Sequence, residues 1–218
     1  MIEFQSVTKE FKTPNGKKTI LKNYTGTINA DKGLAILGGN GAGKSTLVRL
    51  ISGTEIPNKG KIIRKSKCSW PMGLTGTFKP SMTGVDNVKF VARIYNQDPD
   101  KILTEVEDFA EIGDYINMPV GTYSAGMRAR LAFGLSLAVK FDTYLIDEII
   151  AVGDNSFKEK SKNKLLEKIE SSKVILISHQ EYTIREFCDK CAILRNGRLD
   201  IFENLDDGLK EYKEMQNA

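Results

Sequence analysis

The sequence predicts an α/β fold whose sheet is interrupted by a helical insert. Short apolar runs near both ends of the 218-residue chain have the length and composition of strands buried in a parallel sheet. Between about 76 and 140, apolar residues recur at helical spacing instead. A glycine-rich segment, Gly38 to Ser45, joins one apolar run to a helical one. We expect a single domain over 1–218, with a core of about 1–75 and 141–218.

The first third is expected to contain strands around one helix. The helix is predicted over Ser45 to Ser52, with Gly53 as its stop. The expected strands are Met1–Phe4, Thr19–Ile28, Leu34–Leu37, Ile62–Ile63 and Cys68–Trp70.

Three helices are expected in the insert, each with apolar residues on one face. Their apolar positions are Val88, Val91, Ile94 and Tyr95; then Ile102, Val106 and Phe109; then Met127, Leu131 and Leu135 within Ser124–Val139. Beyond the insert, we expect buried strands and an exposed, polar closing helix. These are Thr143–Ile146, Val174–Ile177 and Ala192–Leu194, followed by the helix Asp206–Gln216.

The composition is ordinary for a globular protein and gives no sign of a nucleic-acid-binding or membrane-spanning protein. The net charge of +4 is mild and no run of five like charges occurs, so nucleic acid is not an expected partner. No apolar stretch approaches the ~20 residues that cross a bilayer, so a membrane partner would have to supply the span. The odd number of cysteines, and the lack of a signal peptide before the first strand, indicate the reducing cytoplasm.

Cys188 and Cys191 form a Cys-x-x-Cys spacing. A zinc site would need a second cysteine pair or a histidine pair, and His179 is the sole histidine. We therefore expect two reduced thiols at a junction between a helix and a strand.

The segment Gly38 to Ser45 matches G-x-x-x-x-G-K-[ST] in full, after a strand and before a helix. Glycines allow a tight turn with inward N–H groups, and the helix N-terminus favours phosphate. Lys44 is expected to reach the β- and γ-phosphates of ATP, and the Ser45 hydroxyl to ligate Mg²⁺. The alternative is a chance glycine-rich turn. The predicted nucleotide-binding residues here are Gly38, Gly39, Asn40, Gly41, Ala42, Gly43, Lys44, Ser45 and Thr46.

Two acids end the apolar strand that starts at Thr143. Asp147 is expected to help hold Mg²⁺, and Glu148 to polarise the attacking water as a general base. The alternative is an acid pair on a solvated turn. His179 follows another strand on the side of the sheet where ligands bind, which predicts a γ-phosphate contact, with a structural histidine as the alternative.

At this point the residues resemble those of the ATP-binding cassette (ABC) ATPases. The run Tyr123 to Met127, ahead of an apolar helix, is similar to the signature motif of that family and retains Ser124 and Gly126. The resemblance covers the whole chain. It implies a P-loop NTPase (RecA-like) core with an antiparallel β subdomain and an inserted α-helical subdomain.

The resemblance also implies a head-to-tail homodimer with two ATP molecules in the interface. In such a dimer Ser124, Ala125, Gly126 and Met127 would contact ATP bound to the other copy. Capping of a helix by Ser124 is the alternative and is compatible with this role.

Three further positions follow from the resemblance. Phe11 falls where the family stacks an aromatic ring on adenine, with a core phenylalanine as the alternative, and Asp154 falls in the dimer-contact loop. Lys79 stands where the family has a glutamine that touches Mg²⁺. A lysine cannot ligate a cation, so Lys79 is not counted as a metal ligand.

Further segments resemble the ATPase subunits of bacterial capsular-polysaccharide exporters. These are Ser69–Pro71, Ser81–Asn87, Val91–Tyr95, Tyr123–Phe133 and Tyr144–Asp154. The resemblance implies a peripheral protein on the cytoplasmic face of the inner membrane, with integral permease subunits as partners and a lipid-linked polysaccharide as cargo. Exporters of O-antigen or teichoic acid often carry an added C-terminal domain, which this chain is expected to lack. They remain alternatives, as does a soluble ABC ATPase without a transport role.

Overall fold

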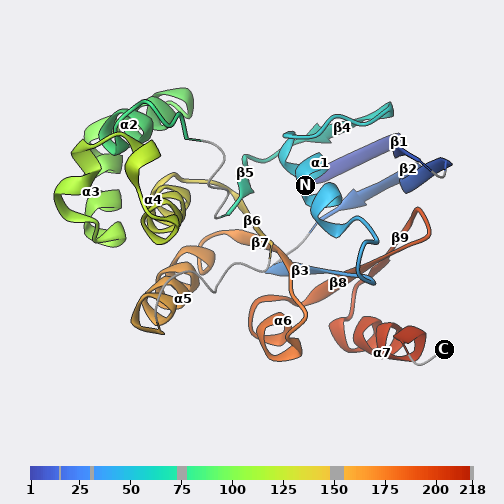
Figure 1. Ribbon diagram of the computed structural model, residues 1–218. Helices are drawn as coiled ribbons and strands as arrows, with labels where there is room; N and C mark the ends of the chain where they lie inside the picture. The colour runs from blue at the N-terminus through green and yellow to red at the C-terminus, as the bar shows by residue number, and fades with distance from the viewer. Residues whose placement is uncertain (15, 30–31, 73–77, 148–154, 217–218) are drawn as a thin grey trace. The chain divides into compact units, whose positions relative to one another are not determined.

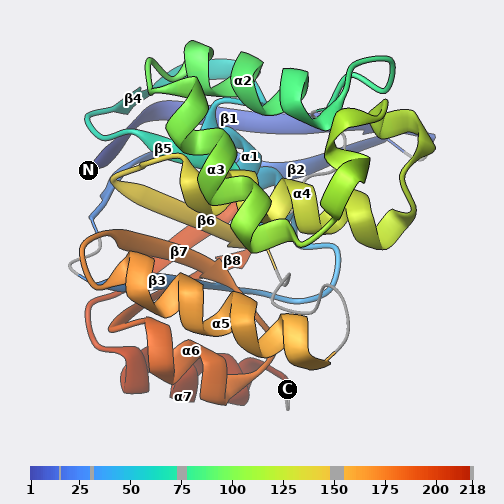
Figure 2. The same ribbon diagram turned by 90° about the vertical axis from the view of Figure 1, so that its left-hand side faces the viewer.

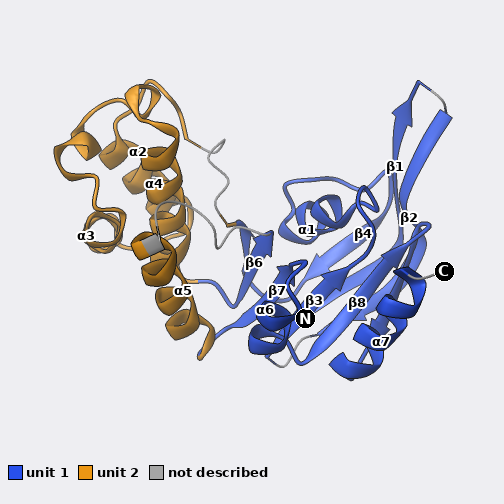
Figure 3. Ribbon diagram, turned by 60° about the horizontal axis from the view of Figure 1, so that its bottom comes forward, with its two compact units in different colours: residues 1–71, 141–148, 171–218 blue, residues 72–140, 149–170 orange. Residues whose placement is uncertain are grey.

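The computed structural model divides into two compact units, and the residues of each unit mainly contact one another (Figure 3). Unit 1 comprises residues 1–71, 141–148 and 171–218, and unit 2 comprises 72–140 and 149–170. The structure describes residues 1–14, 16–29, 32–72, 78–147 and 155–216.

Unit 1 contains two sheets (Figure 1). The larger has the strand order β5-β6-β7-β3-β8-β9 and is parallel except for the antiparallel β8–β9 pair. The smaller is antiparallel with the order β2-β1-β4. The strands are β1 (Ile2–Thr13), β2 (Gly16–Ile28), β3 (Gly33–Leu37), β4 (Lys59–Arg64), β5 (Cys68–Pro71), β6 (Thr143–Asp147), β7 (Lys173–Ile177), β8 (Lys190–Arg195) and β9 (Arg198–Phe202).

Strand β9 was not predicted from the sequence, although a signal for it exists. Asn196 and Gly197 both have positive φ, 47° and 78°, and they join β8 to β9 in a tight hairpin. Asn-Gly between two strands favours such a turn. The prediction missed the strand because Arg198 and Asp200 interrupt its apolar residues.

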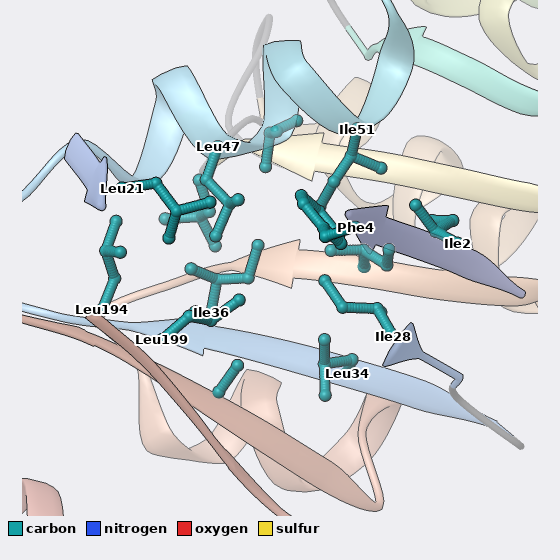
Figure 4. Packing of buried hydrophobic residues seen from close by; sticks show 14 of the residues in the cluster. Ile2, Phe4, Leu21, Ile28, Leu34, Ile36, Leu47, Ile51, Leu194 and Leu199 are labelled. Atoms are coloured by element: carbon teal, nitrogen blue, oxygen red, sulfur yellow. The ribbon is translucent and has the colours of Figure 1, made fainter. Parts of the chain in front are cut away.

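Helix α1 (Lys44–Ser52) lies on one face of the large sheet, and α6 (Glu181–Phe187) and α7 (Leu205–Gln216) lie on the other (Figure 1). Leu47 and Ile51 of α1 are fully buried in one apolar cluster with residues of both sheets (Figure 4). Burying a side chain of this size stabilises the fold by about 1.5–3 kcal/mol. This packing holds the start of α1, and therefore the glycine-rich loop before it.

Helix α7 differs from the prediction of an exposed, polar helix. Leu205, Gly208 and Leu209 are buried. A Cβ atom on Gly208 would lie 2.0 Å from Cys191 Sγ, so the helix backbone packs directly on β8. One apolar stripe on an otherwise charged helix is sufficient to dock it.

Unit 2 is helical (Figure 2). Ile102, Val106 and Phe109 form the buried face of α3, as predicted. Of the apolar residues expected on one face of α2, Val88 is buried and Ile94 is 61% exposed. The elements of unit 2 are α2 (Gly84–Ile94), α3 (Pro99–Ala110), η2 (Gly113–Asn117), η3 (Val120–Thr122), α4 (Ala125–Ala138) and α5 (Asn155–Ile169).

Helix α4 is buried on every side from Leu131 to Ala138, so the predicted one-sided pattern does not apply there. It lies between α3 and α5, and Phe109 of α3 contacts Phe133 with the ring centroids 5.8 Å apart. A helix covered by neighbours on both sides needs no polar face.

Helix α5 lies in the stretch that the sequence interpretation assigned to the core, yet its contacts are with unit 2. The Phe157 ring is 5.2 Å from that of Phe109, and Lys160 Nζ donates to the Phe109 carbonyl at 3.2 Å. Seven of the 15 residues of α5 are charged, and the Phe157 ring and the Lys160 ammonium group join the helix to α3. Strand and helix patterns alone do not reveal such a choice of neighbour.

Candidate nucleotide-binding site

The glycine-rich loop connects β3 to α1 and needs glycine at two positions in particular. Gly38 and Gly43 have φ values of 153° and 104°, and Gly43 caps the N-terminus of α1. A Cβ atom on Gly38 would lie 2.6 Å from the Leu194 carbonyl oxygen, and one on Gly43 would lie 2.6 Å from Ile20 Cγ2. The loop is thus packed against β8 on one side and β2 on the other. The first N–H groups of α1 have no partner within the helix and can bind an anion.

Lys44 lies over this loop. Its Nζ donates to the carbonyl oxygens of Gly38 at 2.7 Å and Gly39 at 3.2 Å. Each carbonyl has a second donor: the Ala42 N–H bonds to Gly39 at 3.1 Å, and the Tyr212 hydroxyl bonds to Gly38 at 3.1 Å. The ammonium group is therefore held at the loop by two bonds.

A pocket of about 270 Å³ lies beside the loop, entirely within unit 1. Phe11, a residue that is 36% exposed, lines it, and Lys9 Nζ lies 4.7 Å from the centroid of its ring. A partly exposed aromatic ring next to a phosphate loop is a suitable surface for a nucleotide base. The lining residues are Phe11, Lys18, Ile20, Gly41, Gly43, Lys44, Ser45 and Thr46.

Lys18 in this lining was not singled out from the sequence. It pairs directly with Phe11 across the β1–β2 hairpin, and its Nζ lies 3.4 Å from where a Cβ on Gly41 would be. The hairpin register, centred near Gly16, was the signal that could have indicated it. Lys18 adds a second ammonium group near the loop.

Two predicted site residues lie at the carboxyl ends of neighbouring parallel strands. Asp147 ends β6, pairs with Ile177 of β7 and is half-buried. His179 follows β7 and is exposed. Strand β7 lies between β6 and β3, which leads into the loop, so all three ends meet at one edge of the sheet. Glu148, the predicted general base, and Asp154 of the predicted dimer-contact loop lie outside the described residues.

His179 does not share the pocket of the loop. It lines a separate one with Leu37 and with Tyr212 and Lys213 of α7. Leu37 immediately precedes the loop, so the two pockets flank the same turn. The structure thus brings His179 close to the end of β3 without placing it beside Lys44.

The signature-like run lies in unit 2 at the start of α4. Ser124 Oγ accepts the Met127 N–H at 3.1 Å, so this serine caps the helix. The nearest atom to a Cβ built on Gly126 is Ser124 Oγ at 3.8 Å, so no described residue of the chain requires a glycine there. Ala125 and Gly126 are exposed.

Lys79 also lies in unit 2 and is exposed. Its N–H donates to Asn87 Oδ1 at 2.9 Å, and the Asn87 amide donates back to its carbonyl at 3.2 Å. These bonds fix the backbone at Lys79 and leave the ammonium group to point outward.

Cys188 and Cys191 lie at the predicted junction between α6 and β8 and are buried. Burial raises the pKa of the Cys188 thiol to about 12 and that of Cys191 to about 11. Within the described part of the chain, no three His, Cys, Asp or Glu side chains are grouped to hold a metal ion.

The fold and the loop define a P-loop nucleoside triphosphatase with an inserted helical unit. A family model described as "ABC transporter" matches residues 21–151. The chain belongs to this family of ATP-binding proteins.

Relatives that align over nearly the whole chain show which members of the family it resembles. The chain is 47% identical to the ATP-binding protein BexA of Haemophilus influenzae, over 99% of this chain and 100% of BexA. It is 45% identical, with the same coverage, to the capsule polysaccharide export ATP-binding protein CtrD of Neisseria meningitidis. The teichoic acids export ATP-binding protein TagH of Staphylococcus saprophyticus is more distant, at 32% identity over 99% of this chain and 89% of TagH.

Solved structures confirm the predicted fold class. A dimeric ATP-binding cassette in a post-hydrolysis state with ADP and Pi superposes with a TM-score of 0.73 and 21% identity, over 92% of this chain and 98% of that one. An ATP-binding subunit of an ABC transporter superposes with a TM-score of 0.76 and 18% identity, over 98% of this chain and 93% of that one. At these identities the likeness concerns the fold.

We expect Gly43→Ala to disrupt the loop, because the new methyl group meets Ile20 and alanine disfavours a φ of 104°. The free energy of unfolding should fall by more than about 1–3 kcal/mol, and nucleotide binding should be lost. Gly113→Ala is the control, since that site has positive φ but open space. Equal destabilisation of both variants in urea unfolding would contradict the predicted clash.

The buried Cys188 thiol predicts a loss of stability at alkaline pH. Its pKa lies above the unfolded value of about 9, so its contribution is complete below pH 9 and is lost as the pH rises toward 12. Relative to Cys188→Ala, the wild type should lose up to about 1.4 kcal/mol more per pH unit above pH 9. Urea unfolding at pH 8 and pH 10 measures this. Cys68→Ala, at a partly exposed site, should show a smaller difference.

Proposed function

We propose that the chain is the ATP-hydrolysing subunit of an ABC transporter that exports a lipid-linked capsular polysaccharide across the bacterial inner membrane. One observation carries the ATPase part: the phosphate loop, its lysine and an exposed aromatic ring line one pocket. Full-length similarity to proteins named for capsule export supports the cargo. The lower identity to TagH makes teichoic acid export the second candidate.

ATP binding follows from the residues around this pocket. Phe11 stacks on adenine, and the N–H groups at the start of α1 hold the phosphates. The Lys44 ammonium group moves from the loop carbonyls to the β- and γ-phosphates. Lys18, which also lines the pocket, adds positive charge that offsets the repulsion between the phosphate groups.

The donor set near the loop suits Mg²⁺. Ser45 presents an exposed hydroxyl in the pocket, and Asp147 presents a half-buried carboxylate at the end of β6. Both are hard oxygen ligands, and two protein ligands leave positions for phosphate and water. Bound Mg²⁺ would neutralise charge on the phosphates.

Hydrolysis is assigned to the residues that follow β6 and β7. Glu148 accepts a proton from the attacking water, and His179 donates a hydrogen bond to the γ-phosphate. Both roles rest on their position after neighbouring parallel strands, at the edge where ligands bind in such sheets.

A second copy of the chain completes the site. A Cβ on Gly126 would meet no described atom closer than Ser124 Oγ at 3.8 Å, and a glycine in an exposed helical turn costs up to about 1 kcal/mol. The use of glycine there therefore favours close approach by something outside the chain. The γ-phosphate bound to the other copy suits this place, with Ser124, Ala125 and Met127 around it at a helix N-terminus. Asp154 is assigned to the contact between copies.

Membrane work requires another protein. Among the described helices, none combines the length and the apolar composition that crossing a bilayer demands. We assign that task to integral permease subunits and place this chain against them on the cytoplasmic face. Unit 2 transmits closure of the ATP dimer to them.

We expect Glu148→Gln to bind ATP normally while phosphate release falls by about 10²–10⁴-fold, because the amide cannot accept the water proton. Unhydrolysed ATP should hold two copies together, which gel filtration detects. Glu203→Gln is the matched control, since the Glu203 side chain is 76% exposed in an ion pair with Lys190. Phosphate release at the wild-type rate would refute Glu148 as the base.

Export is tested in an encapsulated bacterium that lacks its own export ATPase. The wild-type chain should restore surface polysaccharide and co-purify with an integral membrane protein. Glu148→Gln should co-purify equally and leave the polysaccharide inside the cell. Recovery with ribosomes, without any membrane protein, would refute the transport role and leave the ATPase role standing.

A further inference from the structure

The Gly38 carbonyl links the phosphate loop to the last helix of the structure. It accepts from Lys44 Nζ at 2.7 Å and from the Tyr212 hydroxyl at 3.1 Å, although Tyr212 is 174 positions away. Gly38 is buried, packed against the Leu194 carbonyl of β8. The carbonyl oxygen of a buried residue is generally paired with a hydrogen-bond donor, and Lys44 and Tyr212 supply the donors here.

Lys44 has two tasks that exclude each other. Its ammonium group bonds to the Gly38 and Gly39 carbonyls, and it must leave them to reach the phosphates of a nucleotide. A buried carbonyl without a donor is costly, and this cost would be subtracted from nucleotide affinity. The Gly39 carbonyl keeps a donor when Lys44 leaves, because the Ala42 N–H within the same loop also bonds to it. Among the described residues of the loop, Lys44 alone donates to the Gly38 carbonyl, and the second bond of this carbonyl comes from Tyr212.

We propose that Tyr212 is a positioning residue of the nucleotide site: it keeps the Gly38 carbonyl bonded when Lys44 turns to the phosphates. The proposal rests on the proposed function, since it concerns the same loop. With Tyr212 in place, the lysine exchanges two carbonyl oxygens for phosphate oxygens and leaves neither carbonyl without a donor. The loop therefore keeps one shape in both states.

Helix α7 is anchored firmly enough for this role. Leu209 is buried one turn before Tyr212, and Gly208 packs directly on Cys191 of β8. Lys213 pairs with Glu181 of α6 at 2.8 Å. Contacts on both sides of Tyr212 thus fix the hydroxyl relative to the sheet from which the loop emerges.

The test is Tyr212→Phe, which removes the hydroxyl and keeps the ring. Binding of a non-hydrolysable ATP analogue should weaken about five- to tenfold, because Lys44 must then leave Gly38 without a donor. The melting temperature without nucleotide should change by less than about 1 °C, because Lys44 still bonds to Gly38 in that state. Tyr182→Phe, at a side chain on α6 that is 71% exposed, should match the wild type in both measurements.

A double-mutant cycle separates positioning from a general structural role. With Lys44→Met, Gly38 depends on Tyr212 alone, so adding Tyr212→Phe should lower the unliganded melting temperature by about 2–4 °C more than Tyr212→Phe alone. Additive effects, or wild-type nucleotide affinity of Tyr212→Phe, would overturn the proposal. Failure of the proposed function would show differently, as absence of nucleotide binding by the wild-type protein.

Discussion

The site depends on one constraint: the backbone turn between β3 and α1 must hold its shape without a side chain at Gly38 or Gly43. Leu194 of β8 and Ile20 of β2 occupy the space that their Cβ atoms would need. The turn is thus defined by both sheets of unit 1, and the burial of Leu47 in α1 keeps the helix N-terminus aimed at it. The same side-chain packing therefore stabilises the fold and holds the shape of the loop that is proposed to bind phosphate.

Local patterns predicted the parts of the site that are contiguous in the sequence. The loop, and the strand that ends at Asp147, could be identified because each function needs neighbouring residues on one element. Lys18 and Tyr212 were missed because their roles depend on hairpin register and on where α7 docks. The same limit explains α5, whose charged sequence gave no sign that Phe157 packs with unit 2. The roles of the individual site residues remain predictions.

The lysine–carbonyl contacts explain how a phosphate site can be ready before its ligand arrives. An ammonium group without acceptors would lose hydration near the loop, and carbonyls without donors would favour a different turn. Lys44 and the Gly38 carbonyl satisfy each other. In the proposed binding mode, phosphate oxygens would replace the carbonyl oxygens as acceptors, so binding would exchange one set of charge-assisted bonds for another. Little reorganisation of the loop would be required, which would preserve affinity.

Gly43 and Gly126 differ in what explains the absence of a side chain. Gly43 is required by its own chain, since Ile20 blocks a side chain there, and the fold alone accounts for it. Gly126 is not required by any described residue, because a Cβ there would make only an ordinary contact with Ser124 Oγ at 3.8 Å, and its helical turn would be more stable with alanine. A residue that costs stability and relieves no internal clash is best explained by a contact outside the chain. In the proposed head-to-tail pair, the signature-like turn of one copy would contact the nucleotide held by the loop of the other, so each copy would supply what the other lacks.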